Sequence, residues 1–184
     1  RRKQLLEQIG VRYELLLASS DEDAESLERE VPGEAPLTYV KRVTQLKLEA
    51  AVKRMQARGL KPAPVLCADT TVALGRVILG KPENEQDAVR ILKTLSGQTH
   101  RVLTAVAVAS GRRRDLSVSV SKVTFAPMKL SEIKAYVATG EPFGKAGAYG
   151  VQGMAAAYIS EIQGSYTGIM GLPLFETAEL LKNI

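Results

Sequence analysis

The chain has 184 residues, of which 45% are hydrophobic and 24% charged, proportions typical of a globular domain rather than of a disordered, collagen-like or coiled-coil protein. Lysine and arginine outnumber aspartate and glutamate by 25 to 20, and the net charge of +5 suits an anionic partner such as a nucleotide, a phosphate or a nucleic acid. No apolar stretch approaches the ~20 residues that a membrane span needs, and the single cysteine excludes an internal disulfide and favours a reducing cytoplasm.

The first third of the chain predicts two helices around one strand. Residues 1–9 have an apolar helical face that ends at Gly10, and residues 11–17 (VRYELLL) predict a strand. An acidic stretch and a loop with proline and glycine follow. Residues 36–58 then predict a long amphipathic helix that ends at Gly59.

Strands dominate the rest of the chain, with helices between them. The predicted strands cover residues 65–74, 77–79, 100–109, 116–125 and 155–162, and the third and fourth form a hairpin. The predicted helices cover residues 85–95, 130–139 and 173–183, the second of them capped near Ser131. Because a hairpin interrupts the alternation of helices and strands, we expect an α/β protein with a mixed sheet.

Two groups of acidic residues could carry chemistry. Asp69 interrupts an apolar strand, where a carboxylate is costly unless it caps a neighbouring element, is paired or metal-bound, or faces a cleft. Asp21, Glu22 and Asp23 follow the first predicted strand and either hold a divalent cation or form a solvated loop. Because the chain has a single histidine, any metal would be bound by carboxylates, which favours Mg²⁺ or Mn²⁺.

Four basic residues are candidates for binding an anion. Lys47 falls on the mostly apolar stripe of the long helix, so it either extends from the edge of the buried face or points into a site. Lys81 stands between a glycine and a proline on a short loop, where a lysine is either solvated or a phosphate clamp. Arg1 and Arg2 begin the first helix, whose free N–H groups also favour an anion.

Two further segments have open interpretations. The glycine-rich residues 144–153 (GKAGAYGVQG) form either a structural turn or a loop that approaches a ligand closely, with Gln152 able to hydrogen-bond a base edge. Arg112, Arg113 and Arg114 fall at the tip of the predicted hairpin and favour a solvated turn over a nucleic-acid contact, because no aromatic residues are interspersed with them.

Taken together, six segments resemble the Maf family of nucleoside triphosphate pyrophosphatases, in the family's order and spacing. They are RRKQLL, ADTTVALGRVILGKP, DAVRILKTLSGQTH, VTF, EIKAYVATGEPFGKAGAYGVQG and GSYTGIMGLPLFET. The resemblance implies a long twisted mixed β-sheet with flanking helices and two lobes around a nucleotide cleft, similar to the inosine triphosphate pyrophosphatases. It also implies cleavage between the α- and β-phosphates of a nucleoside triphosphate, with Mg²⁺ or Mn²⁺ as the cofactor.

The resemblance assigns roles to several charged residues. Asp69 matches the family's proton acceptor, and Lys47 and Lys81 match its phosphate contacts. The family's acidic pair after the second strand matches Asp21 and Glu22, with Glu22 the better match for a metal ligand. The predicted metal site therefore combines Glu22 with Asp69.

The same resemblance distinguishes two branches of the family. Arg1, Thr70 and Gln152 match the specificity positions of the branch that hydrolyses dTTP, UTP and some modified pyrimidine nucleotides. A sister branch that acts on 7-methyl-GTP has Trp, Gln and Glu at those places. Arg2 is expected to neutralise the phosphates beside the lysines.

We predict one Maf-like domain over residues 1–184. The family's usual opening is a short apolar strand and a Ser-x-Ser-Pro loop before the arginine pair, and we expect these to be missing upstream of Arg1. The resemblance further implies a cytoplasmic homodimer without a membrane segment. The alternatives are a purine (ITP/XTP) pyrophosphatase and a nucleic-acid-binding regulator of septum formation, and we expect nucleic acid not to be the partner.

Overall fold

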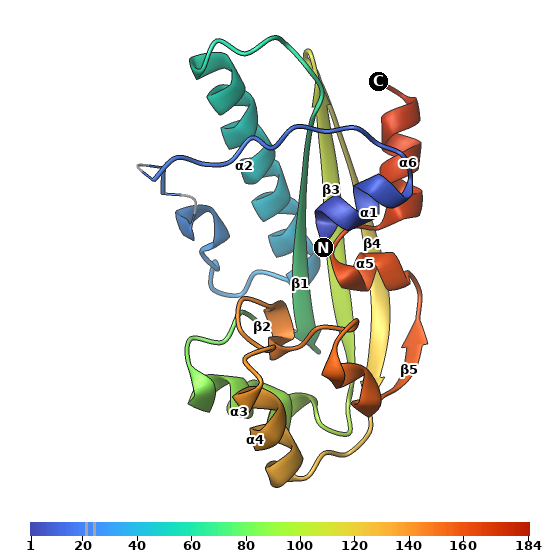
Figure 1. Cartoon of the computed structure of the whole chain (residues 1–184). Coiled ribbons are helices and arrows are strands. Elements are labelled where there is room, and N and C mark those ends of the chain that lie inside the picture. Colours follow the sequence, from blue (N-terminus) through green and yellow to red (C-terminus); the bar gives the residue numbers. More distant parts are fainter. Residues whose placement is uncertain (21, 24) are drawn as a thin grey trace.

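One open sheet of five strands organises the residues that the structure, a computed structural model, describes: 1–20, 22–23 and 25–184. The strand order is β2-β1-β3-β4-β5, and the long strands β1, β3 and β4 run most of the length of the molecule (Figure 1). The strands are β1 (Val65–Leu74), β2 (Val77–Leu79), β3 (Thr99–Ser110), β4 (Arg113–Phe125) and β5 (Ile159–Gln163).

Every strand pair in this part of the chain is antiparallel. β1 lies between β2 and β3 and pairs antiparallel with both, so β2 and β3 run in the same direction without being neighbours. The combination of this sheet with several helices confirms the α/β class. The mixed pairing expected from the sequence does not occur among the described strands. The arrangement of two lobes around a cleft stays a prediction.

Helices cover the sheet in separate groups (Figure 1). The long α2 (Pro36–Ala57) packs against β1 and β3, and α5 (Tyr166–Met170) and α6 (Leu174–Lys182) pack against β3 and β4. At the other end of the strands, α3 (Glu85–Leu95) packs against α4 (Leu130–Ala138). The remaining helical segments are α1 (Arg2–Gln8) and the 3₁₀ turns η1 (Glu25–Glu28), η2 (Ala146–Ala148) and η3 (Met154–Tyr158).

The alternation of side chains along β1 divides the core in two. Val65 and Ala73 pack with residues of α2, whereas Ala68 and Val72 pack in the larger core with residues of α1, α3 and α4. Successive residues of a strand point to opposite faces. Asp69 therefore shares the face that α2 covers.

Most predicted elements are confirmed, with shifted boundaries. Residues 11–17 are the main exception, because they form no strand: no strand of the described sheet pairs with them, and Leu15 and Leu17 are 51% and 67% exposed. The helix predicted to be capped near Ser131 begins after Lys129, whose backbone N–H donates to Glu132 Oε2 at 2.6 Å. The last strand begins only at Ile159, because η3 occupies the preceding residues.

None of the described helices has the length and apolar character that crossing a membrane requires.

Candidate active site

Two lysines and two carboxylates form a charged cluster against α2. Lys47 Nζ donates to Asp69 Oδ1 at 2.5 Å and to Glu28 Oε1 at 2.7 Å. Lys81 Nζ donates to the other Glu28 oxygen, Oε2, at 2.8 Å. Four side chains from α2, β1, the loop after β2 and η1 are thus joined by three ion pairs, and we call them the charged cluster.

The local fold explains why these side chains meet. Asp69 lies on the face of β1 that α2 covers, and Lys47 projects from the facing stripe of α2. The Tyr39 hydroxyl of α2 donates to the backbone carbonyl of Glu28 at 2.8 Å and so holds the end of η1 beside the same helix. Lys81 follows β2 directly, since β2 ends at Leu79.

The charges of the cluster sustain one another. Partial burial alone would lower the pKa of Lys47, but the Asp69 and Glu28 carboxylates outweigh this effect and raise it. Burial likewise opposes ionisation of Glu28, yet the two lysines lower the pKa of its carboxyl. Lys47 is therefore an ammonium and Glu28 a carboxylate at neutral pH, so Lys47 cannot accept a proton from an attacking water.

Thr70 and Arg2 lie on the other side of β1. The Thr70 hydroxyl is 3.0 Å from that of Thr104, its register partner on β3, and the Thr104 hydroxyl donates to the backbone carbonyl of Gly168 at 2.7 Å. Arg2 Nε donates to the Gly171 carbonyl at 2.7 Å. A side chain at Gly171 would begin within 4 Å of both Arg2 and Thr70, so these two predicted residues are neighbours.

The glycine-rich loop is hydrogen-bonded to the residue that precedes Lys81. The backbone N–H of Gly147 donates to the Gly80 carbonyl at 3.1 Å. A side chain at Gly150 would begin 3.3 Å from Lys145 Cε and 3.7 Å from Arg1 Nη1, so these two basic side chains meet over this glycine. Gln152 follows two residues later with an exposed side chain.

Glu141 connects the two ends of the same loop by hydrogen bonds. Its carboxylate accepts hydrogen bonds from the Tyr136 hydroxyl at 2.7 Å and from the Met154 backbone N–H at 3.0 Å. Lys145 Nζ donates to the Glu141 backbone carbonyl. Residues 141 and 154 are thereby held together at the two ends of the loop.

Glu22 has a different set of partners. Arg54 Nε and Nη2 contact its carboxylate at 2.8 and 2.5 Å, and this pairing is the main cause that lowers the pKa of Glu22 to about 2. Arg54 lies two helical turns beyond Lys47, or ~10 Å along α2. The structure does not bring Glu22 to the charged cluster, and Asp21 lies outside the described residues.

Glu28 is the site residue that the sequence analysis missed. Within the acidic stretch the three adjacent carboxylates are the clearest candidates, and no periodicity relates Glu28 to Lys47 nineteen positions later. Among the described residues no group of three or more histidine, cysteine, aspartate or glutamate side chains is arranged to hold a metal ion. Glu28 and Asp69 are, however, two carboxylates that share the ammonium of Lys47.

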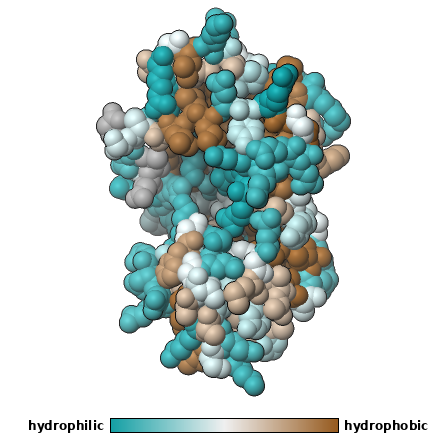
Figure 2. All heavy atoms as spheres, in the orientation of Figure 1, coloured by the Kyte–Doolittle hydropathy of each residue, from teal (hydrophilic) through white to brown (hydrophobic). Residues whose placement is uncertain are grey.

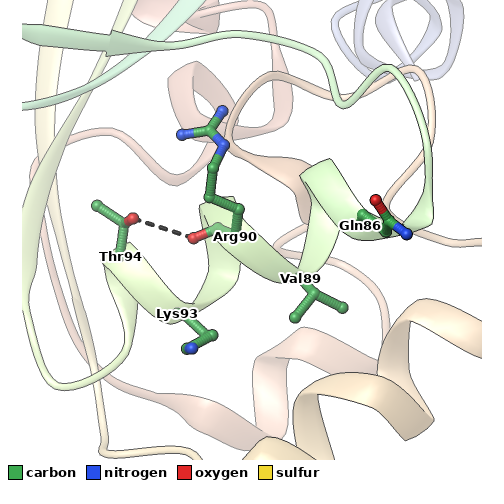
Figure 3. Close-up of a pocket in the computed structure, with 5 residues that line it drawn as sticks. All are labelled: Gln86, Val89, Arg90, Lys93 and Thr94. Atoms are coloured by element: carbon green, nitrogen blue, oxygen red, sulfur yellow. Dashed lines mark hydrogen bonds between the residues drawn. The ribbon is translucent and has the colours of Figure 1, made fainter.

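Two further surface features are seen in the space-filling and close-up views. Figure 2 shows one face of the molecule, on which hydrophilic residues gather in a band at mid-height, where the outline narrows. Figure 3 shows a shallow hollow on α3. It holds none of the cluster residues, and its lining consists of Gln86, Val89, Arg90, Lys93 and Thr94.

Comparison with known proteins gives a single family. The family model described as "Maf-like protein" matches residues 1–184. A protein of Polaromonas sp. (strain JS666 / ATCC BAA-500) named dTTP/UTP pyrophosphatase is 64% identical to this chain over 182 residues, which cover 99% of this chain and 90% of that protein. A protein of Albidiferax ferrireducens with the same name is 62% identical over 183 residues, covering 100% of this chain and 92% of its own. A third so named, from Cupriavidus pinatubonensis, is 59% identical over 182 residues, covering 99% and 91%. The family match over the whole chain and these three relatives show that the chain belongs to the Maf family.

Proposed function

We propose that this chain is a metal-dependent pyrophosphatase that hydrolyses the α–β phosphoanhydride bond of dTTP and UTP to the nucleoside monophosphate and pyrophosphate. The observation that carries the proposal is the charged cluster of Lys47, Asp69, Glu28 and Lys81, found in a Maf chain whose relatives are named dTTP/UTP pyrophosphatase. Opposite charges in one cluster suit a substrate that brings both a polyphosphate and a cation.

Metal dependence accords with family membership, and the donors present fit a hard cation. Glu28 Oε1 and Asp69 Oδ1 lie 2.7 and 2.5 Å from the same Lys47 Nζ, so both can reach one ion. Two carboxylates suffice for Mg²⁺ or Mn²⁺, which complete their coordination with water and phosphate oxygens. Such an ion supplies charge stabilisation at the phosphates in the transition state.

The lysines then have a second set of partners. Without substrate, Lys47 and Lys81 neutralise Glu28 and Asp69. When a triphosphate binds, its oxygens offer these ammonium groups alternative charge-assisted hydrogen bonds. Arg2 is proposed to add a further positive charge, because the Asp69 and Glu28 carboxylates act on its guanidinium and oppose the lowering of its pKa by burial.

Asp69 is proposed to orient or deprotonate the attacking water. Its side chain is only 12% exposed and is held by Lys47, so the direction in which its second oxygen points is defined by the strand and the ion pair. A positioned carboxylate of this kind can act as a general base. Because Lys47 carries its proton at neutral pH, it serves as an electrostatic partner in this arrangement.

The pyrimidine base is proposed to bind near the glycine-rich loop. Thr70 and Gln152 supply hydrogen-bonding groups, and Arg1 lies over the same loop at Gly150. Together they would distinguish dTTP, UTP and some modified pyrimidine nucleotides from purines. A cytoplasmic location and a homodimer stay predictions.

The test is pyrophosphate release from dTTP, UTP, CTP, ITP and 7-methyl-GTP with Mg²⁺ or Mn²⁺. We expect the fastest release from dTTP and UTP, and no release after the metal is removed with a chelator. Preferred turnover of ITP would instead identify a purine pyrophosphatase. No release from any of the nucleotides would refute the proposed activity.

A further inference from the structure

The glycine-rich loop is held from behind by a buried polar pair. His100 of β3 is 1% exposed, and its Nε2 lies 2.7 Å from the hydroxyl of Tyr149, which is 5% exposed. Their rings also meet edge to face at 5.4 Å, and Phe125 of β4 completes the packing at 5.2 Å from His100 and 4.8 Å from Tyr149. The loop is thereby joined to the neighbouring long strands β3 and β4.

The backbone beside Tyr149 is strained. Ala148 has φ of +58°, the only positive value outside glycine among the described residues. A non-glycine residue in the left-handed region is sterically unfavourable and persists only where its surroundings determine it. Tyr149 is the next residue, and its side chain is the deeply buried anchor on that side of the loop.

Further contacts fix the loop on its other sides. Gly147 leaves no room for a side chain, because a Cβ there would lie 2.9 Å from Val72 on β1. Its N–H donates to Gly80, the residue before Lys81. A displacement of Tyr149 would therefore act on the short segment that ends at Gln152.

The His100–Tyr149 hydrogen bond adds direction to this packing. Tyr149→Phe would keep the ring contacts with His100 and Phe125 and lose only the hydrogen bond. In the wild type this bond fixes the distance and orientation of the Tyr149 ring relative to His100. The other imidazole nitrogen, Nδ1, is buried without a hydrogen-bond partner in the described part of the chain. The site thus keeps a polar ring in an apolar setting, where an unpaired nitrogen is costly.

We propose that His100 and Tyr149 are positioning residues for base recognition. Through their hydrogen bond they set the loop geometry that presents Gln152 to the pyrimidine, without themselves touching the substrate. This inference rests on the proposed function and extends it, because it assigns the selectivity for the base to a pair of residues behind the loop. The phosphate chemistry at Asp69 is expected to be independent of the pair.

The test compares Tyr149→Phe with wild type and with Tyr13→Phe. The control loses a hydroxyl that donates to Glu7 Oε1 at 2.8 Å, outside the site. For Tyr149→Phe we expect the ratio of kcat/KM for UTP to that for ITP to fall about tenfold, through a higher KM for UTP at similar kcat. Hydrolysis of ribose 5-triphosphate, which has no base, should stay unchanged, and amide exchange in residues 146–152 should quicken.

The outcomes separate this inference from the proposed function. Wild-type protein that releases no pyrophosphate from UTP or dTTP refutes the proposed function and removes the basis of the inference. Active wild type with an unchanged UTP/ITP ratio in Tyr149→Phe overturns the inference alone. His100→Gln should reproduce the loss of selectivity, and equal losses on UTP and ribose 5-triphosphate in both variants would mean that the pair is merely structural.

Discussion

At the scale of single residues, the carboxylates of the chain differ in their partners rather than in their sequence context. Asp69 and Glu28 share one lysine, whereas Glu22 is occupied by Arg54. A carboxylate held by a lysine that can turn to a phosphate is available for a metal ion. Glu22, which two nitrogens of Arg54 contact, has a structural partner instead. Substitutions of Glu28 and Glu22 should therefore differ in their effect on activity.

Glu28→Gln should lower kcat for UTP at least ~100-fold, because one of two proposed metal-binding carboxylates is lost. Glu22→Gln is the matched control, an identical change nearby in the acidic stretch, and it should change kcat less than about threefold. Both rates are measured over a Mg²⁺ titration, since loss of a ligand should also raise the concentration required. The reverse order of effects would favour the metal site of Glu22 and Asp69 that the sequence predicts.

Asp69→Asn keeps the size of the side chain but removes its basicity. If Asp69 accepts the proton of the attacking water, kcat should fall at least ~100-fold while the protein stays folded. Asp115→Asn is the control, because Asp115 pairs with Arg113 on a more exposed part of β4. Turnover near that of the wild type in Asp69→Asn would exclude Asp69 from this role.

At the scale of elements, local patterns predict what local forces determine. β1, α2 and α3 agree with the sequence analysis because each is a long segment, apolar in β1 and periodic in the two helices, with glycine or asparagine next to it. Residues 11–17 fail because an apolar run becomes a strand only beside a partner, and pairing is not encoded locally. α5 is missed because five residues are too few to show a helical period.

The site follows the same division. Lys47 on the apolar stripe of α2 and Asp69 in β1 can be recognised in the sequence, because each interrupts an apolar pattern. Glu28 is not, because it reaches the site through a 3₁₀ turn held by Tyr39. The opposite orientations of Asp69 and Thr70 do follow from strand alternation, but their partners depend on the packing of α2 and α5.

The glycine-rich loop offers a test of its anchoring. Gly147→Ala places a Cβ at positive φ and 2.9 Å from Val72, whereas Gly111→Ala has positive φ with open space around it. Both pay the left-handed cost of ~1–2 kcal/mol, and overpacking should destabilise Gly147→Ala by a further ~1–3 kcal/mol. Urea unfolding measures the difference, and equal losses would show that the loop is free to move away from β1.

At the scale of the whole molecule, the net charge of +5 does not by itself make a nucleic-acid surface. Two of the three arginines at the β3–β4 turn are already paired, Arg113 with Asp115 and Arg114 with Glu49. We expect no binding of a fluorescent DNA duplex at 50 mM salt by anisotropy. Binding that weakens steeply with added salt would instead support a nucleic-acid-binding function.

The buried His100 links the stability of the molecule to pH. Burial lowers the pKa of His100 from 6.5 to about 4, so above pH ~6.5 the imidazole is neutral in the folded and unfolded states and contributes no pH dependence. Between pH ~6.5 and ~4 only the unfolded chain takes up the proton, so the free energy of unfolding should fall as the pH falls, by roughly 3 kcal/mol at pH ~4. The experiment compares wild type with His100→Gln, which removes this titration while leaving the carboxylates in place.

Urea titrations at several pH values give the free energy of unfolding of each protein. The difference between wild type and His100→Gln should grow as the pH rises through this window and be constant above it. A difference that does not vary with pH would mean that His100 keeps an ordinary pKa in the folded protein.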